Sequence, residues 1–256
     1  MNLILIHPHE PDREGRVRLC GERAEHICTV LRAGSGKALR IGLLNGPLGS
    51  GTVEEIRGKE VVLRCEFEGQ IPARPAVDLL LAMPRPKVMK RLWAQLAALG
   101  VGRIILVNAE KVERFYFDSH VLEPDFYAAR LAEGLQQAGD TIVPEVRIVK
   151  ELKPFLEDEL DRVFPADGIR LLADPSGAQN IFQCLEKSNI PAPRGDVPQR
   201  SCLAVGPEGG WTPYELEMFT AHGFEVFNAG TRILRTDTAC VALLSMLTLL
   251  SGADEK

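Results

Sequence analysis

The larger, C-terminal part of the chain alternates short apolar runs with segments whose apolar residues recur every three or four positions. Short runs predict buried strands, and the wider spacing predicts helices with one apolar face. One such helix carries Val88, Leu92, Leu96 and Leu99 on a single face. The expected strands are 77–82, 103–107, 145–149, 169–173, 202–205 and 224–229, and the expected helices are 86–99, 125–138, 151–164, a segment from 213, and 239–250. This alternation predicts an α/β fold with a mostly parallel sheet covered on both faces.

The first 70 residues follow a different pattern. Short runs of β-forming residues are separated by Gly, Asn and Pro, which predicts strands joined by turns. The expected strands are 3–6, 16–20, 39–44, 51–56 and 60–67, with one helix at 22–33. Many short strands with frequent turns suggest a small β-barrel. With Pro72 and Pro75 at the boundary, we predict an N-terminal domain of residues 1–72 and a C-terminal domain of residues 73–256.

Composition and charge narrow the functional classes. The chain has 256 residues, 45% of them hydrophobic, which suffices for one large or two ordinary domains. The net charge of −5 argues against a uniformly basic surface for nucleic acid, but residues 1–74 carry +1, so a polyanion would bind at a local patch. The N-terminus lacks the basic flank of a signal peptide, and the apolar run 239–250 is too short to span a bilayer. We therefore expect a cytoplasmic protein with no membrane partner.

Three predicted strands end in loops that suit a ligand. After strand 202–205, Gly206, Gly209 and Gly210 fall within five residues, whereas an ordinary strand–helix turn needs one glycine. Clustered glycines let main-chain amides approach a ligand. Loops at the carboxyl ends of parallel strands are where open α/β sheets bind ligands. The other two loops are 173–177 and 230–236.

Helix-start signals follow two of these loops. Thr212 is suited to cap a helix, Pro213 fits its first position, and Glu215 completes a capping box. Thr236 is a suitable N-cap for the last helix, whose apolar composition predicts burial. These signals explain local geometry without any function.

Basic residues form two groups. One group opens the helix at 86–99, where positive charge opposes the helix dipole, so either phosphate binding or a solvated face explains it. The other group lies in the N-terminal domain. Together the groups comprise Arg85, Lys87, Lys90 and Arg91, and Arg13, Arg16, Arg18, Arg23, Arg32, Lys37 and Arg40. They would clamp an RNA backbone despite the acidic total charge.

Other sites are disfavoured by spacing. The segment 34–38 looks like part of a phosphate loop, but Leu31 stands where glycine is required and Ala38 where Ser or Thr is required. The histidines have no metal-ligand spacing, so we expect no metal.

Two C-terminal motifs resemble those of one enzyme family. GPEGGW at 206–211 and GTRILRTDTA at 230–239 are similar to the paired motifs of SPOUT-class RNA methyltransferases. Within that class, the chain looks like the 16S ribosomal RNA (uracil-N3)-methyltransferase family. Weaker similarities lie at 26–41, 45–51, 97–102 and 143–146.

The resemblance implies a fold and a cofactor. The family has an N-terminal PUA-like barrel that binds RNA and a C-terminal α/β domain with a deep trefoil knot, and it is homodimeric. Its cofactor is S-adenosylmethionine, which the knot loops hold. Carried over by position, the cofactor-binding residues are Ala173, Asp174, Val205, Gly206, Glu208, Gly209, Gly210, Ala229, Gly230, Arg232, Ile233, Leu234 and Thr236.

The resemblance also implies a reaction, the methylation of a base in ribosomal RNA at N3 of a uridine in the small subunit. Negative charge that develops on the uracil oxygens requires a cation, and Arg235 is the expected one. Glu208 is the expected proton acceptor or positioning residue, although it could merely hold its own loop. The residues expected to contact RNA phosphates are Arg32, Arg85, Lys87, Lys90 and Arg91.

Rival functions remain open at this stage. The same scaffold could methylate a ribose 2′-hydroxyl or another base. A non-catalytic RNA-binding factor in ribosome assembly would keep a vestigial pocket, although the intact GPEGG and RILRT segments disfavour it. A nucleotide-binding regulator is a weaker option.

Overall fold

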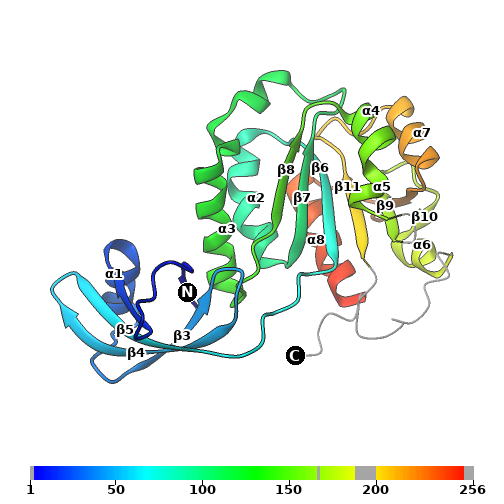
Figure 1. Ribbon diagram of the computed structural model, residues 1–256. Coiled ribbons are helices and arrows are strands. Elements are labelled where there is room, and N and C mark those ends of the chain that lie inside the picture. Colours follow the sequence, from blue (N-terminus) through cyan, green and yellow to red (C-terminus); the bar gives the residue numbers. More distant parts are fainter. Residues whose placement is uncertain (1–2, 166–167, 188–199, 251–256) are drawn as a thin grey trace. The chain divides into compact units, whose positions relative to one another are not determined.

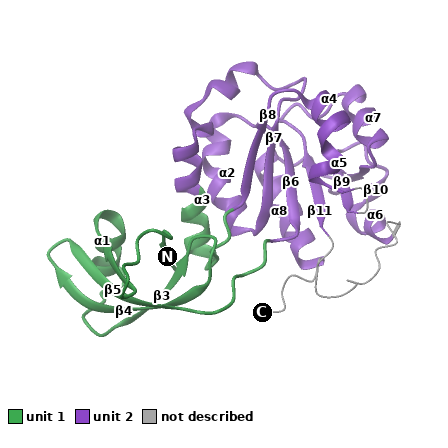
Figure 2. Cartoon of the chain, in the orientation of Figure 1, with its two compact units in different colours: residues 1–74, 131–143 green, residues 75–130, 144–256 purple. Residues whose placement is uncertain are grey.

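The computed structural model describes residues 3–165, 168–187 and 200–250, which belong to two compact units (Figure 2). The first unit comprises Met1–Arg74 and Leu131–Val143, and the second comprises Pro75–Arg130 and Pro144–Lys256. That 131–143 folds with the N-terminal residues was not expected from the sequence.

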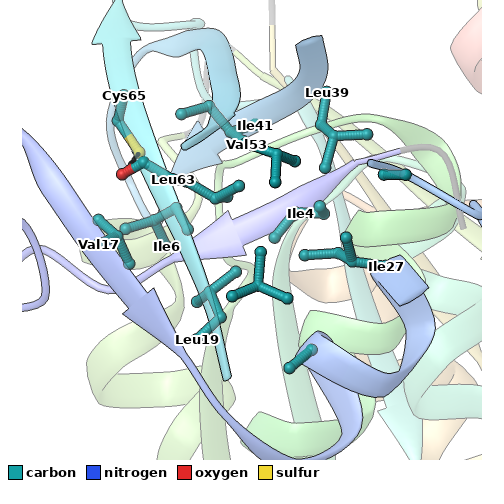
Figure 3. Close-up of a cluster of buried hydrophobic side chains, with 13 residues drawn as sticks. Ile4, Ile6, Val17, Leu19, Ile27, Leu39, Ile41, Val53, Leu63 and Cys65 are labelled. Atoms are coloured by element: carbon teal, nitrogen blue, oxygen red, sulfur yellow. Dashed lines mark hydrogen bonds between the residues drawn. The ribbon is translucent and has the colours of Figure 1, made fainter. Parts of the chain in front are cut away.

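The first unit contains a curled five-stranded sheet (Figure 1). Its elements are β1 (Ile4–Ile6), β2 (Arg16–Leu19), α1 (Gly21–Thr29), β3 (Ala38–Leu43), β4 (Leu48–Arg57) and β5 (Glu60–Phe67), as the sequence predicts to within a few residues. The strand order is β1-β3-β4-β5-β2, with β1 parallel to β3 and the other pairs antiparallel. Inward-facing residues such as Ile6, Val17 and Leu63 meet Ile27 of α1 in the core (Figure 3).

Hydrogen bonds explain why 131–143 folds with this unit. The N–H of Leu3 donates to the carbonyl oxygen of Gln136 over 3.1 Å. The fully buried hydroxyl of Thr141 donates to the carbonyl oxygen of Gly46 over 2.6 Å, and the Asn45 side chain accepts from the N–H of Val143 over 2.9 Å. A buried hydroxyl needs such a partner, so the turn at 45–46 and this segment stabilise each other.

The second unit is built on a seven-stranded sheet in which every neighbouring pair is parallel. In the order β10-β12-β9-β11-β6-β7-β8, the strands are Gln179–Asn180, Glu225–Asn228, Ile169–Ala173, Ser201–Val205, Val77–Ala82, Val101–Val107 and Glu145–Val149. The helices are α2 (Pro86–Ala98), α4 (Leu152–Pro154), α5 (Leu160–Val163), α6 (Ile181–Lys187), α7 (Pro213–Ala221) and α8 (Thr236–Leu250), and α3 (Pro124–Ala138) contributes residues to both units. In Figure 1, α2 and α8 lie behind the strands and α4 and α5 lie in front. The predicted α/β class with a parallel sheet is confirmed.

The details of three helices differ from expectation. The buried face of α2 centres on Met89, Leu92, Trp93 and Leu96, because the indole N–H of Trp93 donates to a buried backbone carbonyl, that of Val121. The predicted helix 151–164 is interrupted between α4 and α5 by a π-helical segment, η3, at Phe155–Glu159. Neither α6 nor the two-residue β10 was expected.

Helix α8 is expected to be buried, and it is buried on one side only. Cys240, Leu243 and Leu247 face the sheet, whereas Leu249 and Leu250 are 70% and 47% exposed. The reason is geometric, since a helix that packs on one face of a sheet leaves its outer face to solvent. None of the helices in the described ranges is both long and apolar enough to cross a bilayer.

At the amino end of the parallel sheet, buried charged side chains pair with charged neighbours. Asp78 on β6 is fully buried, and its carboxylate accepts a hydrogen bond from Nε of Arg200 over 3.1 Å. Arg103 on β7 lies 3.7 Å from the same carboxylate. Burial raises the pKa of Asp78, and the two arginines oppose that effect. On β9, Arg170 is 7% exposed and donates to the carboxylate of Asp161 over 2.6 Å.

Candidate functional site

A cavity of about 870 Å³ lies at the carboxyl ends of β9, β11 and β12, where the three predicted loops meet. Each predicted cofactor-binding residue lines it, and so do Arg85 and Arg235. The complete lining is Arg85, Ala173, Asp174, Pro175, Val205, Gly206, Pro207, Glu208, Gly209, Gly210, Trp211, Asn228, Ala229, Gly230, Thr231, Arg232, Ile233, Leu234, Arg235, Thr236, Ala239 and Leu243. The fold therefore gathers segments that are far apart in sequence around one space.

A tight turn shapes the loop after β11. The N–H of Gly210 donates to the carbonyl oxygen of Pro207 over 2.9 Å, which closes the turn 207–210. Gly210 has a φ of +68°, a left-handed conformation that side chains disfavour. A Cβ on Gly206 would lie 3.0 Å from Nε1 of Trp211, so this glycine makes room for the buried indole. Two of the three glycines thus have structural reasons that precede any ligand.

Helix α7 begins as the sequence predicts. Thr212 accepts a hydrogen bond from the N–H of Glu215, and the Glu215 carboxylate accepts from the N–H of Thr212 over 2.7 Å. Pro213 occupies the first helical position. This capping box fixes the direction in which the chain leaves the cavity.

One asparagine joins the other two loops. Nδ2 of Asn228 donates to the carbonyl oxygen of Gly177 over 2.6 Å, and its Oδ1 accepts from the N–H of Gly230 over 3.2 Å. A Cβ on Gly177 would lie 2.4 Å from the carbonyl carbon of Phe227, so only glycine permits this approach. The loops after β9 and β12 are therefore held side by side.

Asp174 uses half of its carboxylate to shape its own loop. Its Oδ1 accepts hydrogen bonds from the N–H and the hydroxyl of Ser176, over 2.9 and 2.6 Å. Within the described residues, its other oxygen has no hydrogen-bond donor. That oxygen is available to a hydroxyl or ammonium group of a ligand.

The loop between β12 and α8 is the most exposed wall of the cavity. Ile233 is 88% exposed, and Arg232 and Arg235 are also exposed. Thr236 is not the N-cap that the sequence predicts. It is the first helical residue, buried, and its hydroxyl donates to the carbonyl oxygen of Gly206 over 3.4 Å. The carbonyl oxygen of Arg235 accepts from the N–H of Ala239, so Arg235 takes the N-cap position and the helix starts one residue earlier than expected.

Glu208 lies on the cavity wall and connects it to α2. Its Oε1 accepts a hydrogen bond from the N–H of Arg85, the residue before α2, over 3.2 Å. A carboxylate at a helix N-terminus is favoured by the helix dipole. This contact explains Glu208 as a residue that holds its loop against α2.

Three arginines line the cavity without a neutralising partner. No carboxylate in the described residues forms an ion pair with Arg85, Arg232 or Arg235. Each is exposed at the end of the sheet where α2, α7 and α8 begin. Helix N-termini carry partial positive charge, so this end of the unit favours anions.

The other predicted RNA contacts have different environments. Lys87 and Lys90 are exposed on α2, whereas Arg91 pairs with Asp237 over 3.2 Å. In the first unit, Arg32 is exposed with a φ of +46°, an uncommon conformation for a side-chain residue. Arg16, Arg18 and Arg23 are each bound to glutamates, which leaves Arg13, Arg32, Lys37 and Arg40 without a carboxylate partner in the part of the chain that the structure describes.

Among the residues that the structure describes, no cysteine lines the cavity. In the described ranges, no three His, Cys, Asp or Glu side chains gather in a way that would hold a metal. Burial raises the pKa of the Cys65 thiol to about 11 and that of Cys240 to about 12, so both stay protonated at neutral pH.

Sequence reasoning missed several residues of the cavity. Asn228 had a usable signal, because it ends a strand two residues before a glycine. Leu243 had another, since it follows Thr236 and Ala239 at helical spacing. The other lining residues outside the predicted set lie within the loops and motifs that the sequence singles out, and they are Pro175, Pro207, Trp211, Thr231 and Ala239.

Known proteins share this architecture. Residues 72–248 match the RNA methyltransferase domain family. Ribosomal RNA small subunit methyltransferase E of Treponema pallidum is 30% identical over 249 residues, 96% of this chain and 90% of the relative. Ribosomal RNA small subunit methyltransferase E 1 of Borreliella burgdorferi is 26% identical, covering 94% and 95% of the two chains. The crystal structure of the Neisseria gonorrhoeae methyltransferase E, bound to S-adenosyl methionine, shares the fold with a TM-score of 0.74, 20% identity and 98% coverage of both chains.

Proposed function

This chain belongs to the ribosomal RNA small subunit methyltransferase E family, and from that premise we propose that it methylates N3 of a uridine in 16S ribosomal RNA with S-adenosylmethionine as donor. The observation that carries the proposal is the cavity at the carboxyl ends of β9, β11 and β12. Its walls contain both motifs of the family resemblance, GPEGG and RILRT.

The residues present suit S-adenosylmethionine. Within the described residues, the N–H groups of Glu208 and Gly209 have no acceptor, and one oxygen of Asp174 has no donor. Such groups match the carboxylate, ammonium and hydroxyl groups of the cofactor. Val205 and Leu243 supply the apolar surface that a purine requires.

The chain's own residues would align the reacting groups and stabilise the charge that develops on the base. S-adenosylmethionine supplies a methyl group that its sulfonium already activates, so alignment and exclusion of water account for much of the rate. The ring nitrogen of uracil must lose its proton, and negative charge then develops on the ring oxygens. Arg235, exposed on the cavity wall without a carboxylate partner in the described ranges, is suited to stabilise that charge.

Glu208 is better suited to positioning than to accepting a proton. Its carboxylate already accepts the N–H of Arg85. By holding Arg85 at the cavity, Glu208 would keep a second cation near the RNA backbone. Arg32, Lys87, Lys90 and Arg91 would contact further phosphates.

Three finer features of the family belong to this proposal. The curled sheet of the first unit supports a PUA-like barrel that binds RNA. The three loops gathered at one end of the parallel sheet support the deep trefoil knot. The exposed leucines at the end of α8, Leu249 and Leu250, support a homodimer that would cover them. A ribosomal RNA substrate supports a cytoplasmic location.

Mass spectrometry of 16S rRNA from a deletion strain tests the proposal. We expect one N3-methyluridine to disappear and to return with the wild-type gene. A missing ribose methyl, or a methyl missing from another base, would assign a different target to the same scaffold. If no methyl mark is lost, an RNA-binding role in ribosome assembly replaces the catalytic one.

A further inference from the structure

Lys111, in the segment after β7, holds the cavity loop from outside. It does not line the cavity itself. Its Nζ donates to the carbonyl oxygens of Gly209 and Trp211, over 2.9 and 3.4 Å. We infer that Lys111 is a positioning residue for the cofactor, an inference that rests on the proposed function. No motif or family position pointed to it.

The lysine stem explains the remaining glycine of GPEGG. A Cβ on Gly209 would lie 3.1 Å from Cδ and 3.3 Å from Cβ of Lys111, which is closer than side chains normally pack. Gly209 therefore lets the aliphatic stem of Lys111 lie against the main chain. The loop is covered by Lys111 on one side and faces the cavity on the other.

The residue before Lys111 adds a second attachment. The N–H of Glu110 donates to Oε1 of Glu215 over 2.8 Å. Glu215 is 4% exposed, and its other oxygen accepts from the N–H of Thr212. Residues 110–111 thus bind the loop and the helix start that follows it.

The charge of Lys111 strengthens the bonds that shape the loop. The carbonyl of Gly209 shares a peptide group with the N–H of Gly210, which closes the turn on Pro207. A cation at one end of a peptide group polarises it and makes the N–H at the other end a better donor. Lys111 has no carboxylate partner among the described residues, so its ammonium group interacts with these two carbonyl groups instead. The N–H groups of Glu208 and Gly209, which line the cavity and have no acceptor in the described residues, would then be available to the cofactor.

Calorimetric titration of S-adenosylmethionine into purified variants tests this role. We expect Lys111→Met to raise the Kd about tenfold, since it removes a charge-assisted hydrogen bond and keeps the stem. KM for the cofactor should rise in parallel while kcat at saturation stays within about threefold. Lys111→Arg keeps the charge and should restore affinity to within about threefold of wild type.

Lys153→Met is the matched control. Lys153 is exposed on α4 and pairs with Glu157 over 3.7 Å, and it reaches Tyr214 of α7 without touching the loop. Its substitution should change the Kd less than twofold. Thermal unfolding should confirm that each variant is folded at the temperature of titration.

Several outcomes would overturn the inference. Lys111→Met with wild-type affinity and a lowered Tm would mean that the residue only stabilises the fold. Equal losses in the Met and Arg variants would refute the role of the charge. If wild-type protein takes up no S-adenosylmethionine, the proposed function fails as well, whereas normal wild-type uptake with normal uptake by Lys111→Met removes the role of Lys111 alone.

Discussion

The two ends of the parallel sheet use arginine in opposite ways. At the amino end, Arg103 and Arg200 surround the buried carboxylate of Asp78. At the carboxyl end, Arg232 and Arg235 are exposed on the cavity wall, and no carboxylate in the described part of the chain pairs with them. Arginine therefore neutralises a buried carboxylate at one end of the unit and leaves the other end positively charged.

This difference separates stability from binding within one unit. Removing one member of a buried ion pair leaves the other charge uncompensated. Substitutions at the amino end should therefore change the free energy of folding. An exposed arginine contributes little to folding and keeps its charge for an anion. The positive end coincides with the starts of α2, α7 and α8, which explains how a chain of net charge −5 would attract RNA locally.

The largest effect is expected at the amino end. Asp78→Asn removes the charge that Arg103 and Arg200 surround and should lower the free energy of unfolding by about 3 kcal/mol. Urea denaturation measures this change. Molecules that remain folded should bind S-adenosylmethionine as tightly as wild type, because the cavity lies at the opposite end of the strands.

Glu145→Gln is the control for that substitution. Glu145 pairs with the same Arg103 over 3.3 Å, but its side chain is 60% exposed. Solvent screens such a pair, so the loss should be about 0.5 kcal/mol or less. Equal losses from the two substitutions would show that burial of Asp78 does not distinguish this end of the sheet.

The second prediction reverses the pattern. Arg235→Ala should lower kcat for methyl transfer about 100-fold, the size of effect seen when a group that stabilises developing charge is removed. Its free energy of unfolding should change by less than about 0.5 kcal/mol, since the side chain is exposed. Arg162→Ala, an exposed arginine on α5, is the control and should stay within about twofold in kcat. Methylation by Arg235→Ala within a few-fold of wild type would remove this residue from the reaction.

The third prediction concerns Gly209. A valine there would press on the stem of Lys111 and move the loop, so the Kd for S-adenosylmethionine should rise roughly 30-fold, the equivalent of about 2 kcal/mol of overpacking. Circular dichroism should show a retained fold. Gly69→Val is the control, because a Cβ on Gly69 meets open space and this residue is far from Gly209 in the sequence. It should leave the Kd unchanged. An unchanged Kd in Gly209→Val would separate this loop from the cofactor site.

Most elements of the fold could be predicted from sequence because burial sets them locally. The runs at 60–67 and 77–82 become strands with the bounds expected. The placement of 131–143 could not be predicted, because it depends on the hydroxyl of Thr141 meeting the carbonyl of Gly46, a long-range contact with no periodic signal. Leu92 and Leu96 of α2 are buried as expected, but Trp93 was missed for a similar reason, since its indole forms a tertiary hydrogen bond.

In the candidate site, too, local features could be predicted from the sequence and long-range contacts could not. The loops were identifiable because glycine clusters and helix starts are local, and the capping box at Thr212 formed as expected. Lys111 could not be found because it acts on carbonyl groups of a distant segment, whereas Asn228 had a local signal, although its bond to Gly177 is also long-range. Whether the predicted residues bind the cofactor stays a prediction that the variants above address.

The smallest effect is expected from the bond that joins two loops at the carboxyl end. Asn228→Ala removes the donor to Gly177 and the acceptor for Gly230, and it should weaken S-adenosylmethionine binding about threefold, with little change in stability because the side chain is only partly buried. Asn228→Asp keeps the acceptor but sets a negative oxygen against the carbonyl of Gly177, so it should weaken binding more, about tenfold. Calorimetric titration of S-adenosylmethionine into the two variants shows which of them binds more weakly. If alanine is worse than aspartate, repulsion at Gly177 is not the controlling term. If both lower the free energy of unfolding as much as Asp78→Asn does, the two ends of the sheet do not differ in the way their arginines suggest.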